Sequence, residues 1–113
     1  MLTLETLKAF GANVEEGLGR CMNNEQFYLM LVKKAIAKDD TPELKTALET
    51  GDLDRAFEIC HNIKGVAGNL ALTPILVPVA EMTEYLRNRT VMDYTPYLAA
   101  VIEKTAELKA LAE

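Results

Sequence analysis

The spacing of apolar residues along the chain predicts helices throughout. Apolar positions recur at intervals of three and four, and no segment shows the alternation of a half-buried strand. Several of the segments have the length of bundle helices, and short connectors join them. We therefore expect an all-α fold, an antiparallel four-helix bundle with additional short N-terminal helices. The expected helices cover Leu4 to Phe10, part of 11–20, Asn24 to Lys38, a short stretch after Pro42, Leu53 to Leu70, a stretch from Thr73, and Thr95 to Leu111.

Particular residues mark the expected helix ends. Thr41 is expected to be the N-cap of a short helix with Pro42 at its first position, and Gly51 to end it. Asp52 is expected to cap the helix that follows. Pro78 should distort the early turns of the helix from Thr73, because proline has no backbone N–H and crowds the preceding turn.

Helical wheels predict which residues of two helices face the core. In the helix from Asn24, Met30 lies outside the apolar arc. That arc consists of Phe27, Tyr28, Leu31, Val32 and Ala35. In the Leu53–Leu70 helix the buried arc consists of Ile59, Ile63, Val66 and Leu70, flanked by Ala56, Cys60 and Ala67. The only histidine of the chain, His61, lies on the opposite side. It shares that side with Phe57, Glu58, Lys64, Gly65 and Gly68.

Composition and charge narrow the class of protein. A chain of 113 residues can bury one modest core, so we expect residues 1–113 to form a single domain. The formal charge of −5 argues against nucleic-acid or anionic-membrane partners, which need clustered lysine and arginine. Without an apolar run of bilayer length or a signal peptide, we expect a cytoplasmic protein. Cys21 and Cys60 form no CxxC pair, so neither a disulfide nor a zinc site is expected.

The residues around His61 indicate more than an idle surface histidine. Gly65 and Gly68 each cost about 1 kcal/mol relative to alanine inside a helix. Small residues there clear a shallow space where the backbone of another molecule can approach. Phe57 is an expected exposed aromatic residue where a solvated helix would carry a charge. The convergence of these features on one histidine favours a site for a partner.

The chemistry open to a single exposed histidine is limited. Roughly three quarters of an unperturbed imidazole is neutral at pH 7, and the neutral ring is a good nucleophile toward phosphorus. Lys64, one turn on, would offset the charge of an added phosphoryl group. The number of ligands is too small for a metal site, and no third group supports a hydrolytic nucleophile. The chain has no ATP-binding loop, so a phosphoryl group must come from another protein.

At these residues the chain resembles the histidine-containing phosphotransfer (HPt) domains of multistep phosphorelays. Their helix typically reads H-x-[LI]-K-G-x-[AS]-x-x-[LI]-G-[AL], and this chain reads HNIKGVAGNLAL from His61. The resemblance extends upstream through ALETGDLDRAFEICH and implies that His61 is the phospho-acceptor and Lys64 its charge partner. It implies that Gly65 and Gly68 give clearance for a receiver domain. The implied partners are response-regulator receiver domains and a hybrid sensor histidine kinase, with Mg²⁺ on the receiver and no cofactor on this chain.

The chain departs from the family pattern at a few positions. Ala71 stands where a glycine is common, and Pro78 replaces a usual apolar residue. Thr83 stands where relatives often carry a glutamate or glutamine that bonds the imidazole or the phosphoryl group. Thr83 is therefore the candidate for this supporting contact, although its side chain is shorter.

These observations lead to one main hypothesis and two alternatives. The main hypothesis is a phosphocarrier, without an ATP site or catalysis of its own, that docks receivers through Phe57, Glu58, Met30 and the two glycines. The first alternative is a helical adaptor or dimerisation domain that binds a partner through the Phe57, Gly65 and Gly68 face without phosphorylation. The second is a degenerate relay domain that binds receivers without accepting phosphate.

Overall fold

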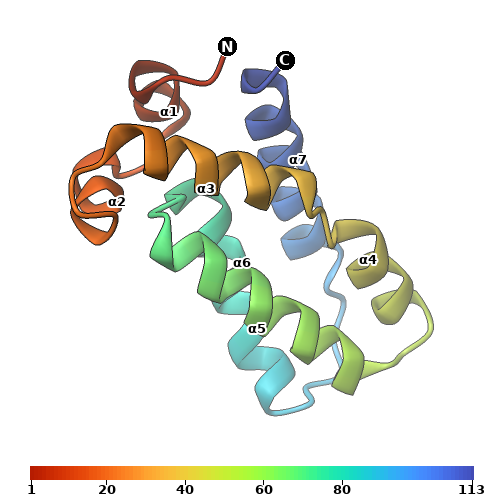
Figure 1. Cartoon of the computed structure of the whole chain (residues 1–113). Coiled ribbons are helices and arrows are strands. Elements are labelled where there is room, and N and C mark those ends of the chain that lie inside the picture. The colour runs from red at the N-terminus through yellow and green to blue at the C-terminus, as the bar shows by residue number, and fades with distance from the viewer.

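The computed structural model describes residues 1–113 and consists of seven helices without a strand (Figure 1). The all-α prediction is confirmed. No helix has the length and apolar character needed to cross a membrane. The helices are α1 (Leu4–Phe10), α2 (Val14–Arg20), α3 (Glu25–Ala37), α4 (Thr41–Glu49), α5 (Leu53–Asn69), α6 (Thr73–Arg87) and α7 (Thr95–Leu111).

Short polar side chains begin several of these helices. The side chains of Asn13, Asn24 and Asp52 each accept a hydrogen bond from a backbone N–H in the first turn of α2, α3 and α5. Asp52 therefore caps α5 as predicted. The predicted N-cap at Thr41 is wrong, because α4 already begins at this residue. Asp39 instead contacts this first residue of the helix. One oxygen of the Asp39 carboxylate accepts hydrogen bonds from both the backbone N–H and the hydroxyl of Thr41.

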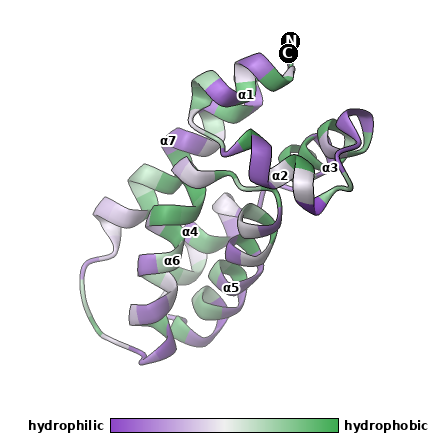
Figure 2. Ribbon diagram, turned by 90° about the vertical axis from the view of Figure 1, so that its left-hand side faces the viewer, coloured by the Kyte–Doolittle hydropathy of each residue, from purple (hydrophilic) through white to green (hydrophobic).

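Helices α4 to α7 form the four-helix bundle. Helix α5 packs against α4 and α6, α7 packs against α6, and α7 also contacts α4. The long helices α5 and α6 run antiparallel across a three-residue connector (Figure 1). Each helix carries both hydrophobic and hydrophilic residues, as the colours in Figure 2 show, and the hydrophobic sides meet in the core. The buried residues at its centre are Leu44, Ala47, Ala56, Ile59, Cys60, Val79, Met82, Leu86, Tyr94 and Val101.

The N-terminal helices cover one end of this bundle. Helix α3 runs across that end, and both chain termini lie near it (Figure 1). Tyr28 of α3 is fully buried, and its hydroxyl donates a 2.8 Å hydrogen bond to the carbonyl of Leu70. Gly17 of α2 lies directly against this ring, and an added Cβ would be 2.6 Å from it. A second buried cluster therefore joins the N-terminal helices to α5, α6 and α7. It comprises Leu2, Leu7, Ala12, Cys21, Tyr28, Val32, Ala67, Leu70, Leu72, Ile75 and Leu108.

Two residues expected in the core are exposed. Tyr28 and Val32 of α3 are buried as predicted, but Phe27 is 38% exposed. Val66 of α5 is 45% exposed, whereas its neighbour Ala67 is buried. Both differences follow from the position of α3, which crosses the end of the bundle and covers only part of α5. Helix α6 continues through Pro78 without interruption.

Candidate functional site

His61 lies on the outer face of α5, as its wheel predicted. The opposite side of the helix is held in the core by Ala56, Cys60 and Ala67, which are all buried. Because residues one turn apart share a face of a helix, this packing forces the imidazole outward. His61 is exposed. A nucleophilic nitrogen is thus presented to solvent by a helix that is fixed along its other side.

Phe57, one turn before His61, stacks on the imidazole. The two ring centroids are 5.7 Å apart, and the ring planes are inclined by 24°. The guanidinium carbons of Arg87 and Arg89 lie 5.2 and 4.9 Å from the centroid of the Phe57 ring. These are cation–π distances, so the ring contacts two cations as well as the histidine. Phe57 is half-buried as a result, and the prediction of an exposed aromatic residue is wrong.

Arg89 is the better anchored of the two arginines. It has a φ of 51°, in the left-handed region, just after α6. Its guanidinium forms an ion pair with Asp54 of α5 and donates hydrogen bonds to the carbonyls of Leu86 and Arg87. The C-terminal end of α6 is therefore tied to the first turn of α5, which places positive charge beside Phe57.

Lys64 is held by α6 in this structure. Its ammonium nitrogen is 3.8 Å from a carboxylate oxygen of Glu84, and the other oxygen of Glu84 is 3.4 Å from Nε of Arg87. All three side chains are substantially exposed to solvent. Ion pairs of this kind contribute about 0–1 kcal/mol, so Lys64 can leave Glu84 at little cost. Its position one turn from His61 allows it to reach a group attached to the imidazole.

The two glycines after His61 are not required by the packing of this chain. A Cβ added to Gly65 would meet no atom within 4 Å, and one added to Gly68 would meet only Leu76 Cδ1 at 3.9 Å. Both glycines lie within α5 and neither has a positive φ. The space beside His61 is therefore open to solvent, unlike the space at Gly17. The absence of side chains at these two glycines therefore leaves room for another molecule to approach His61.

Thr83 does not make the supporting contact expected of it. Its side chain is fully buried in α6, and its hydroxyl donates a 2.6 Å hydrogen bond to the carbonyl of Val79. This bond occupies the hydroxyl within its own helix, and no hydrogen bond joins it to His61. Glu84, the next residue, lies on the exposed face and bridges Lys64 to Arg87.

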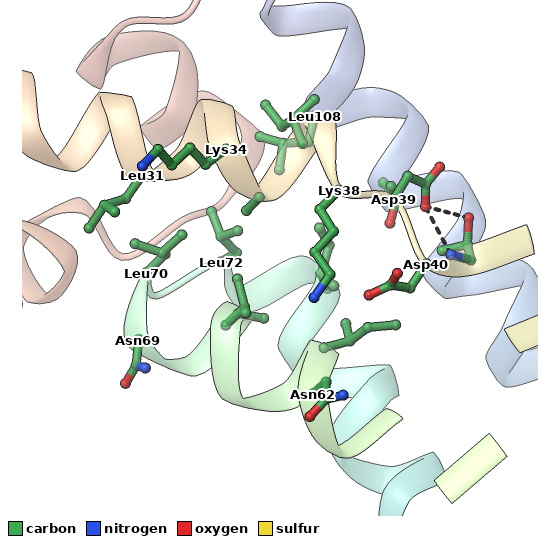
Figure 3. Close-up of a pocket in the computed structure, with 18 residues that line it drawn as sticks. Leu31, Lys34, Lys38, Asp39, Asp40, Asn62, Asn69, Leu70, Leu72 and Leu108 are labelled. Carbon is green, nitrogen blue, oxygen red and sulfur yellow. Dashed lines mark hydrogen bonds between the residues drawn. The ribbon is translucent and has the colours of Figure 1, made fainter. Parts of the chain in front are cut away.

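The two remaining predicted docking residues, Glu58 and Met30, lie on different helices. Glu58 is exposed on α5 and accepts a hydrogen bond from Arg55, which also pairs with Glu43 of α4. Met30 belongs to α3 and is 43% exposed. It is not among the α3 residues that face α5 across the cavity shown in Figure 3. The structure therefore brings Phe57, Lys64 and the glycines together around His61, and leaves Met30 on another helix.

Glu84, Arg87 and Arg89 were not predicted from the sequence as neighbours of this site. Glu84 and Arg87 lie in the second half of α6 and Arg89 lies just after its end, where the chain runs alongside the first half of α5. A signal for them exists, because a three-residue connector between antiparallel helices sets residues at equal distances from the turn beside one another. Pairing the helices in this way would have placed the arginines near Phe57.

Other reactive groups near His61 are absent or inactive. Cys60 is buried in the core, its sulfur lies 3.3 Å from that of Met82, and burial raises the pKa of its thiol to about 12. A thiol with this pKa is a poor nucleophile near neutral pH. No three His, Cys, Asp or Glu side chains lie close enough together to hold a metal ion. The face thus offers one exposed imidazole bordered by cations.

Comparison with known families matches residues 35–113 to the Hpt domain. The matched residues contain all of α4 to α7, and so the whole four-helix bundle with His61 and the cations around it. Searches of curated proteins and of solved structures give no match.

Proposed function

Because the chain belongs to the Hpt domain family, whose role is histidine phosphotransfer in phosphorelays, we propose that His61 is its phospho-acceptor. The observation that carries this proposal is the exposure of the only histidine beside open space at Gly65 and Gly68. The family interacts with receiver domains and kinases. On this chain a receiver's phosphoaspartate would be the donor, and the aspartate of a second receiver would be the final acceptor.

The transfer needs only the imidazole from this chain. The unprotonated ring nitrogen of His61 attacks phosphorus, the bond from phosphorus to the aspartyl oxygen breaks, and the carboxylate leaves on the receiver. The second transfer is the same step in reverse with another carboxylate. Phe57 covers one face of the imidazole but leaves the ring edge free, so an in-line approach to a ring nitrogen stays open. Any Mg²⁺ would belong to the receiver.

Lys64 is proposed to stabilise the phosphorylated state. A phosphoryl group on His61 would compete with Glu84 for the Lys64 ammonium, and the existing pair is long and exposed. A charge-assisted hydrogen bond to phosphate is stronger than such a pair. Lys64 would therefore move from Glu84 to the phosphoryl group when His61 is modified.

The receiver is proposed to dock on the face formed by Phe57, Glu58, Gly65 and Gly68. The glycines supply clearance that nothing in this chain uses. Met30 belongs to this surface if the receiver also reaches α3. The adaptor alternative would use this same face, and because Phe57 packs within this chain it offers a partner of either kind little free aromatic surface.

The test is phosphoryl transfer from a panel of radiolabelled phospho-receivers, with a known Hpt domain as positive control. We expect acid-labile, alkali-stable label on the wild-type chain and none on His61→Gln. Label on both proteins would contradict the assignment of His61. A wild-type chain that stays unlabelled while the control is labelled would favour the adaptor or the degenerate relay domain. Stable binding of a receiver domain, unchanged in His61→Gln, would then favour the degenerate relay domain over the adaptor.

A further inference from the structure

A cavity lies between α3 and α5, away from the cluster around His61. Its volume is about 370 Å³, within the range of small-molecule sites. Leu31 and Ala35 line it from α3, Ile63 and Val66 from α5, and Leu72 and Leu108 line it as well (Figure 3). His61 does not line it, because its side chain points about 100° away from that of the neighbouring Asn62.

We propose that this cavity binds a small amphiphile, an apolar chain that carries one anionic head group such as a carboxylate. This binding function is separate from phosphoryl transfer and does not rest on it. The apolar part of the proposal comes from the walls. Val66 is 45% exposed although it sits one residue from buried Ala67, and it faces a cavity lined mainly by aliphatic side chains. An apolar chain in the cavity would remove this surface from water.

The charge of the head group follows from the groups at the rim. Lys34 lies in the last turn of α3 and Lys38 caps the end of that helix, and neither has an ion-pair partner in the structure. The ammonium of Lys38 extends into the space between α3 and α5 (Figure 3). Of the two carboxylates nearby, Asp39 is already engaged by Lys109 and by Thr41. Asp40 is the remaining carboxylate without an ion-pair partner, so the lining carries two unpaired cations and one unpaired anion. Only Lys38 extends into the space, because the Lys34 side chain points toward Leu31 (Figure 3).

The amide side chain of Asn62 offers a second polar contact for the head group. Asn62 lines the cavity from α5, and Figure 3 places it on the same side as the end of Lys38. An amide N–H₂ can donate a hydrogen bond to a carboxylate that the ammonium has attracted. The expected pose therefore puts the head group between Lys38 and Asn62, with the chain along Ile63 and Val66.

Binding is tested with three probes that have similar alkyl chains and differ in the charge of the head group. They are octanoate, octanol and octyltrimethylammonium, all below their micelle concentrations. Calorimetry or NMR titration of the full chain should give saturable binding of octanoate, at least about tenfold tighter than octanol, which corresponds to about 1.4 kcal/mol. The cation should bind more weakly than octanol. Equal affinities for the three probes, or no saturable binding of octanoate, would overturn the proposal.

Variants locate the site and separate charge from packing. Lys38→Gln should weaken octanoate binding about tenfold and leave octanol unchanged, whereas Asp40→Asn should strengthen octanoate binding. Lys33→Gln is the matched control, because Lys33 is an exposed lysine of the same helix outside the cavity. Ala35→Phe should fill the cavity and abolish binding of both probes, with circular dichroism to check the fold. The exposed lysine variants keep the test valid if Ala35→Phe does not fold.

One outcome would assign the cavity to a macromolecule instead. If Ala35→Phe leaves octanoate binding unchanged but weakens binding of a receiver domain, the groove is part of a protein interface and the amphiphile proposal is wrong. Loss of octanoate binding in Ala35→Phe with normal phosphoryl transfer would support the proposal and show that the two functions are separate.

Discussion

Replacing Gly65 by alanine should make the protein more stable. An added Cβ would meet no atom within 4 Å, and the backbone there is an ordinary helix, so no strain opposes the change. Alanine is favoured over glycine inside a helix by about 1 kcal/mol. For a chain of 113 residues this gain should raise the midpoint of thermal unfolding by about 4 °C. Calorimetry or chemical denaturation would measure it directly.

The same position should lose function when the added side chain is large. Gly65→Gln should keep the helical fold, because the side chain extends into solvent, yet obstruct a receiver that approaches His61. We expect phosphoryl transfer to fall at least tenfold with no loss of stability. Such a split between stability and transfer cannot arise from misfolding.

Two other glycines of the chain serve as controls. Gly19 lies in the last turn of α2, and an added Cβ there also meets nothing, so Gly19→Ala should stabilise the protein somewhat less and leave transfer unchanged. Gly17→Ala should destabilise it, because the Cβ would be 2.6 Å from the ring of buried Tyr28. A less stable Gly65→Ala protein would refute the claim that the space is open. Normal transfer by Gly65→Gln would refute the claim that a receiver uses it.

Three further predictions follow from the contacts. Lys64→Ala should slow phosphoryl transfer or shorten the lifetime of the phosphohistidine, measured by the decay of radiolabel, and unchanged kinetics would remove Lys64 from the mechanism. Burial alone would raise the pKa of Asp39, but hydrogen bonds from Lys109 and Thr41 outweigh it and lower the pKa below 3.8. This carboxylate therefore adds stability above its unfolded pKa that is lost as pH falls through its folded pKa. Lys109→Met should flatten the acid limb of a stability–pH curve, and an unchanged limb would contradict the pairing. Cys60, buried and with a pKa of about 12, should react with a thiol reagent only as fast as the protein unfolds, and rapid labelling of the native chain would contradict its burial.

Local signals in the sequence were sufficient for most of the helices. The bounds of α1 and α7 agree with those predicted, because Gly11 ends α1 in a left-handed conformation and Thr95-Pro96 begins α7. The outward position of His61 was predictable as well, since the apolar arc of its own helix determines it. These features depend on residues a few positions apart.

The features that escaped prediction depend on how helices pack. A wheel places Val66 on the apolar side of α5, but only the course of α3 decides whether anything covers it. Thr83 was assigned by alignment to a family pattern, and its hydroxyl instead bonds to its own helix. The cations beside Phe57 become neighbours of His61 only when α6 folds back on α5.

The hydrogen bond from Tyr28 to Leu70 bears on where the protein can be cut. The part matched to the Hpt family begins at residue 35, inside α3. A fragment that began at Ala35 would lose the N-terminal helices with Tyr28 and Val32. It would thereby uncover Leu70, Ile75 and Leu108, which pack in the same buried cluster. Uncovering apolar surface of this kind promotes aggregation. Fragments for expression should therefore begin before α1, and a boundary taken from the family match alone should yield an insoluble product.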